Sequence, residues 1–154
     1  MLVGHGMVTR QVLGPVTFGG APEPLTLALR RYRCRGCRAV LVVGPRGVLP
    51  GRWYSGPAIA GALAAFASGA TSATVRTGTS PSRAVGVAAA ERWVTLERWV
   101  EAARGGRLFA VSGLGELSPR RVAEQVTLAL AARGGHLPGG DLGASAFAGA
   151  AMAA

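Results

Sequence analysis

The chain is 154 residues long, carries a formal net charge of +10 and contains 24 glycines but only 6% aromatic residues. This length fits one domain, or two very small ones, with a core of modest size. All 17 basic residues are arginines. Because abundant arginine, alanine, glycine and valine also indicate a GC-rich coding sequence, the net charge alone establishes no function.

Residues 1–46 predict a small basic β unit. β-Prone segments occur at residues 7–13, 25–33 and 39–43. Glycine and proline interrupt the chain after the first segment, and the sequence Cys-Arg-Gly-Cys at residues 34–37 predicts a tight turn between the other two. We therefore expect two or three short strands, followed by a linker.

The linker, residues 47–55, precedes a helical region whose helices begin at Ser-Pro, Ser-x-Pro or Thr signals. These signals predict helices over residues 56–68, 80–90, 95–104 and 118–133. The first three form a predicted helical domain, residues 56–110. The last belongs to a C-terminal segment, residues 111–154, whose alanine-rich tail we expect to be a weak helix or disordered.

Residues 53–75 carry no charge, so a membrane span must be considered. Small residues dominate this stretch, and they contribute little transfer free energy to the bilayer. Ile59, Leu63 and Phe66 instead recur at the spacing of a helix that packs one face on a core. The start of the chain also lacks the pattern of an export signal. We expect a cytoplasmic protein, nucleoid-associated if it binds DNA, whose cysteines are reduced.

The arginines are unevenly distributed along the chain. Between Glu23 and Glu91 there is no acidic residue but there are nine arginines, whereas six acids and seven arginines follow from Glu91 onward. A segment of one sign repels itself unless a polyanion neutralises it, and nucleic acid is the commonest such partner. The distribution therefore indicates duplex DNA as the partner. We expect no small-molecule substrate.

Residues 80–104 predict a helix-turn-helix, because two short helices are joined by about four residues. In the second helix, an apolar stripe that includes Trp99 would face the core, and Thr95 and Arg98 would lie near the base edges. The candidate DNA-binding residues are Arg30, Arg31, Arg33, Arg35, Arg38, Arg52, Arg76, Arg83, Arg92, Thr95, Arg98 and Arg104.

Three short motifs resemble the N-terminal region of bacterial insertion-sequence transposases and related helix-turn-helix proteins. Residues 30–38 read Arg-Arg-Tyr-Arg-Cys-Arg-Gly-Cys-Arg, residues 48–55 read Val-Leu-Pro-Gly-Arg-Trp-Tyr-Ser, and residues 95–99 read Thr-Leu-Glu-Arg-Trp. The resemblance covers roughly residues 5–110. It implies an α+β fold in which a degenerate zinc-ribbon β unit precedes an α-helical helix-turn-helix domain.

The resemblance fails at the metal site. A zinc ribbon needs four ligands in a tetrahedron, usually two Cys-x-x-Cys turns, and this chain has only Cys34 and Cys37. His5 and His136 are the only other soft or borderline ligands, and their spacing does not favour a site. We therefore expect an incomplete site at the two cysteines and no bound cofactor.

No catalytic residues are expected. The seven acids do not form a carboxylate trio with supporting context, and no Ser/His/Asp set is recognisable. The favoured function is DNA binding by a transposase-like or mobile-element-derived protein without its own catalytic domain. Two alternatives remain: a non-enzymatic structural protein that forms a homodimer through residues 56–68 and 118–133, and a peripheral membrane protein that uses Trp53 and Tyr54.

Overall fold

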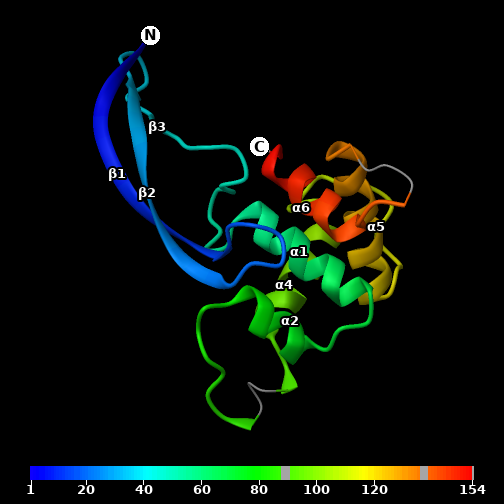
Figure 1. Ribbon diagram of the computed structural model, residues 1–154. Helices are drawn as coiled ribbons and strands as arrows, with labels where there is room; N and C mark the ends of the chain where they lie inside the picture. The colour runs from blue at the N-terminus through cyan, green and yellow to red at the C-terminus, as the bar shows by residue number, and fades with distance from the viewer. Residues whose placement is uncertain (88–90, 136–138, 154) are drawn as a thin grey trace.

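A computed structural model of the chain describes residues 1–87, 91–135 and 139–153. A three-stranded antiparallel sheet comes first, and five helices follow it in the described part of the chain (Figure 1). The predicted α+β class, a β unit followed by a helical region, is therefore confirmed. Within the described ranges, no helix is both long enough and apolar enough to cross a membrane.

The sheet is built on one long hairpin. Strand β1 (Leu2–Pro15) pairs with β2 (Pro22–Cys34) along its length, and β3 (Val40–Val43) adds to the far end of β2. The strands occupy the predicted positions, but the first two extend beyond the predicted bounds because they support each other through their backbone hydrogen bonds.

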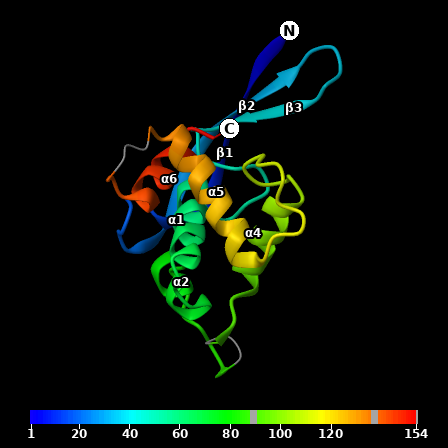
Figure 2. The ribbon, with the colours of Figure 1, turned by 90° about the vertical axis from the view of Figure 1, so that its right-hand side faces the viewer.

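One end of the hairpin packs on the helices and the other projects away from them (Figures 1 and 2). Phe18, in the turn between β1 and β2, makes an edge-to-face contact with Phe147 at 6.0 Å between ring centroids. The opposite end, which carries the N-terminus and the turn between β2 and β3, is solvated. We call this projecting part, residues 1–10 and 28–43, the arm.

The helical body contains most of the buried residues. Its helices are α1 (Gly56–Ala67), α2 (Ser72–Thr79), α4 (Val94–Arg104), α5 (Pro119–Arg133) and α6 (Leu142–Ala151). The predicted apolar stripes face one another within the chain. The largest fully buried side chains are Ile59, Leu63, Leu96, Val122, Val126, Thr127 and Leu130. The apolar faces of α1 and α5, proposed above as dimer surfaces, are thus covered inside one chain.

The prediction of a helix over residues 80–90 is wrong for residues 80–86, which are not helical. Residues 88–90 lie outside the described part of the chain. A helix that was not predicted, α2, occupies the preceding segment instead and ends with Ser80 as its C-cap. The Ser80 hydroxyl accepts hydrogen bonds from the Tyr54 hydroxyl at 2.9 Å and from the Ser82 N–H at 3.3 Å, although no helix follows it over residues 80–86.

Two further helix boundaries differ from the predictions. Thr95 was expected to cap its helix, but α4 begins at Val94 and its N-cap position is Trp93, which makes no side-chain cap hydrogen bond. The alanine-rich tail forms a complete helix, α6, whose Ala146 and Ala150 are fully buried. Asp141 begins this helix by accepting a hydrogen bond from the Ala144 backbone N–H at 2.8 Å.

Helices α5 and α6 approach so closely that only glycine fits between them. A Cβ on Gly149 would overlap the Leu130 carbonyl oxygen and lie 2.9 Å from the Gly134 nitrogen. We expect Gly149→Ala to lower the free energy of unfolding by about 1–3 kcal/mol, the usual cost of overpacking. Gly78→Ala in α2, where nothing lies within 4 Å, is the matched control and should be neutral or slightly stabilising in urea unfolding. Equal effects of the two substitutions would contradict the packing.

Candidate nucleic-acid interface

The arm concentrates positive charge. It carries six arginines and no acidic residue. Arg30 and Arg33 on β2 and Arg35 and Arg38 in the following turn are exposed, whereas Arg31 is half-buried. Among the described residues, the ion pairs between arginine and glutamate all lie in or next to the helices α4 and α5. The charge of the arm is therefore not neutralised by the protein's own carboxylates in this structure.

The arm also exposes apolar side chains between its arginines. All four residues of β3, the sequence Val-Leu-Val-Val, are about half exposed, between 47% and 51%. Arg33 pairs with Val40 and Arg31 with Val42 across the sheet, so each pair of partners points to the same face. The arm therefore presents arginine and aliphatic side chains together on one face of its sheet.

Helix α4 presents a second, less basic surface. Its predicted core residue Trp99 is 3% exposed, whereas Arg98 lies on the solvent-exposed side of the helix. Thr95 is only half-exposed, because it lies within the first turn of the helix. The structure therefore brings these two predicted readout residues to one side of α4, with Arg98 the more accessible.

Two of the predicted DNA-binding arginines on this surface are held by acids. Arg92 donates to both carboxylate oxygens of Glu97 at 2.5 Å. These hydrogen bonds lower the pKa of Glu97 and raise that of Arg92. Arg104 pairs with Glu101 at 2.5 Å and also donates to the Leu117 carbonyl at 2.8 Å. Both arginines are consequently less available to a polyanion than those of the arm.

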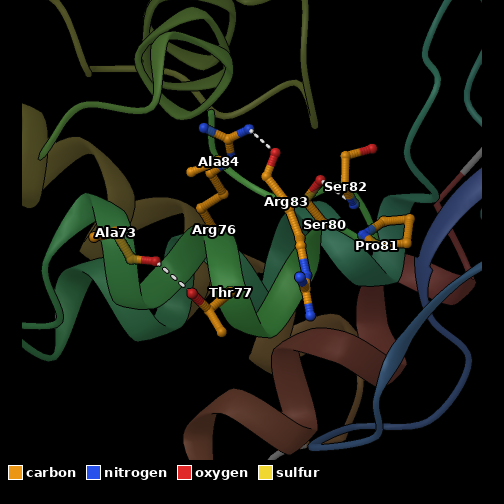
Figure 3. A pocket seen from close by; sticks show the side chains of 8 residues that line it. All are labelled: Ala73, Arg76, Thr77, Ser80, Pro81, Ser82, Arg83 and Ala84. Carbon is orange, nitrogen blue, oxygen red and sulfur yellow. Dashed lines mark hydrogen bonds between the residues drawn. The ribbon is translucent and has the colours of Figure 1, made fainter. Parts of the chain in front are cut away.

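Arg76 and Arg83 line one cavity of about 280 Å³, beside the C-terminal end of α2. Arg76 Nη2 donates to the Arg83 carbonyl oxygen at 3.2 Å, and Thr77 Oγ1 donates to the Ala73 carbonyl at 3.1 Å (Figure 3). The guanidinium groups of the two arginines point in opposite directions in this view. The two arginines therefore share a surface without converging on one point.

Arg52 lies in the linker, half-buried between the arm and the helices. The Arg52 backbone carbonyl accepts a hydrogen bond from the guanidinium of Arg10, which also donates to the Leu49 carbonyl at 2.7 Å. Arg10 was not singled out from the sequence, since its role depends on residues about 40 positions away. It fixes the linker against β1 and thereby positions Arg52.

Cys34 and Cys37 lie at the end of the arm. The Cys37 backbone N–H, followed by that of Gly36 and the Cys37 side chain, hydrogen-bonds to Cys34 and lowers the pKa of its thiol. Among the described residues, no three His, Cys, Asp or Glu side chains gather where they could hold a metal ion. His136 lies outside the described part of the chain.

We expect the purified protein to keep its melting temperature in a strong chelator. Two thiolates supply half of a tetrahedral zinc shell, and the folding free energy of true ribbons comes from a closed one. The measurement is thermal unfolding with and without chelator, together with the metal content after purification without added zinc. One zinc per chain, or a clear drop in melting temperature, would show that a second chain or a histidine completes the site.

In comparisons with known proteins, no family model, curated protein or solved structure matches this chain.

Proposed function

We propose that this protein binds duplex DNA through its arm, with the exposed face of α4 as a second contact. The observation that carries the proposal is the arm itself, a projecting part of the sheet with no acid and with five arginines besides Arg10, whose guanidinium is bonded to the linker. Within the proposal, the arm follows a groove and its arginines neutralise phosphates. Arg98 lies on the separate α4 surface, where a base-edge contact would contribute sequence preference.

The biological setting that we propose is a transposase-like or mobile-element-derived DNA-binding protein without its own catalytic domain. The three short motifs described above support this setting. Of the predicted helix-turn-helix, only the second helix has support, because residues 80–86 are not helical and the helix that precedes them, α2, ends at Thr79. The arm, rather than a helix pair, therefore has the larger share in the proposed contact.

The proposal predicts a steep dependence of DNA affinity on salt. If about five phosphates are neutralised, the logarithm of the binding constant should fall with the logarithm of salt concentration with a slope of about −4 or steeper. The measurement is fluorescence anisotropy with a labelled duplex across a series of salt concentrations. A flat response, or no binding at low salt, would reject phosphate-driven DNA binding.

An oligomeric structural protein is the second candidate, and the exposed edge strand β3 favours it. An open strand edge offers backbone groups to a second copy. Sedimentation of the protein without DNA tests this candidate, since a stable dimer that retains no DNA would support it. A membrane-surface role is less well supported because Tyr54, one of its two proposed anchors, packs against Trp93 and Trp99.

A further inference from the structure

Trp53 is 68% exposed although tryptophan is a costly residue to leave in water. The neighbouring Tyr54 packs edge to face against Trp93 and Trp99, with ring centroids 5.9 and 5.0 Å away. Tyr54 therefore faces the helical body, whereas Trp53, at a bend of the chain, is left in solvent.

The backbone around Trp53 is held in place. The Leu13 N–H donates to the Trp53 carbonyl at 2.8 Å, and the Ser55 N–H donates to the Leu13 carbonyl at 3.2 Å. The Arg10 guanidinium fixes the preceding residues through the carbonyls of Leu49 and Arg52. Trp53 is thus an exposed ring on an anchored segment, not a side chain on a free loop.

A cavity of about 580 Å³ opens beside this ring. It is lined by Thr9, Arg10, Gln11, Gly51, Arg52 and Trp53. The space is open to solvent at the junction of β1 and the linker. It combines one large aromatic surface with polar side chains and a peptide backbone, which is the combination that a nucleobase requires for stacking and hydrogen bonding.

A second cavity, of about 350 Å³, adjoins the first through Arg52, which lines both. Arg107 and Arg133 also line it, and Arg133 donates to the Phe109 carbonyl at 3.1 Å. Of the described residues that line the two cavities, none is acidic. Three arginines therefore line the second cavity, and one of them, Arg52, also lines the cavity beside the aromatic ring. Phosphate groups are favoured next to arginine side chains.

We infer that the junction of the arm and the helical body binds an unpaired nucleotide of DNA, with its base stacked on Trp53 and the adjoining phosphates beside Arg52, Arg107 and Arg133. This inference rests on the proposed DNA binding and adds to it a preference for DNA that contains an unpaired base. A base inside an intact duplex cannot stack on the ring, because both of its faces are covered by neighbouring base pairs.

The test compares a fully paired duplex with the same duplex carrying one unpaired thymine. A base–aromatic stack is worth roughly 1–3 kcal/mol by alanine substitution, so the unpaired thymine should raise the affinity by about tenfold. Trp53→Ala should reduce this ratio to near one, whereas Trp53→Phe, which keeps an aromatic face, should retain part of it. Arg107→Gln should weaken binding of the thymine-containing duplex more than binding of the paired one.

Tryptophan fluorescence gives a second readout. Trp93 and Trp99 are 6% and 3% exposed, so quenching by single-stranded oligothymidine should come from Trp53 and disappear in Trp53→Phe. Equal affinity for the two duplexes, or a preference that survives Trp53→Ala, would overturn the inference. Salt-dependent binding of the paired duplex would then still support the proposed function. Binding of single-stranded DNA without any binding of the paired duplex would support stacking on Trp53 and would reject the proposed duplex binding.

Discussion

Replacing Trp99 by alanine is expected to lower the free energy of unfolding by about 3–5 kcal/mol, the cost of truncating a large aromatic residue in a core. Trp99 is 3% exposed. Its ring lies 5.0 Å from those of both Tyr54 and Trp93, in edge-to-face geometry. These contacts join the linker, α4 and the residue before α4, so the substitution should affect the whole helical body. Urea unfolding followed by circular dichroism measures the change.

The control is Trp53→Ala, which removes the same side chain from an exposed position. Surface substitutions usually change stability by no more than about 0.5 kcal/mol. If Trp99→Ala unfolds at the same urea concentration as the wild type, the aromatic cluster does not form and the position of α4 is wrong. If both variants are strongly destabilised, Trp53 has a structural role in addition to its exposed ring.

Replacing Arg33 and Arg35 together by glutamine is expected to weaken duplex binding by about 30-fold, because an exposed ion pair contributes up to about 1 kcal/mol to the binding free energy. The salt slope should become shallower by about two, because two fewer counterions are released. Both side chains are exposed near the end of the arm, so the fold should be unaffected. Anisotropy titrations at several salt concentrations measure both quantities.

Arg121→Glu is the matched control, because this single substitution changes the net charge as much as the double variant. Arg121 lies in the first turn of α5, outside the arm, and is already paired with Glu124 at 2.6 Å. A carboxylate is also tolerated near a helix N-terminus. If the control weakens DNA binding as much as the arm variant, the effect comes from total charge and the arm is not the contact surface.

Local signals in the sequence were sufficient for several elements. Ser55 and Pro57 predict the start of α1, and the Ser55 hydroxyl accepts from the Ala58 N–H at 3.1 Å as an N-cap does. The spacing of Val122, Val126 and Leu130 predicts the buried face of α5, and all three are fully buried. These predictions succeed because capping and amphipathic spacing depend on residues within a few positions of one another.

Other features depend on partners far along the chain. The Ser80-Pro81 signal resembles a helix start, and the Ser80 hydroxyl does accept from the Ser82 N–H at 3.3 Å. Residues 80–86 are nevertheless not helical, and the same hydroxyl is bonded to Tyr54, 26 residues earlier. The alanine-rich tail has little amphipathic pattern, and its helix α6 is stabilised by close packing on α5, where Gly149 allows the backbones to approach. Tertiary contacts override weak local preferences in both places.

The features of the candidate site also fall into those that the local sequence predicts and those that depend on distant partners. By itself, the sequence determined that the first half of the chain is basic and free of acids after Glu23, and that Trp99 belongs to a buried stripe. Only the tertiary structure decided that the basic residues project on an arm, and that Trp53 rather than Tyr54 faces solvent. Composition and short periodicity are properties of neighbouring residues. Exposure and the shape of a surface arise from contacts between distant segments, which no local pattern contains.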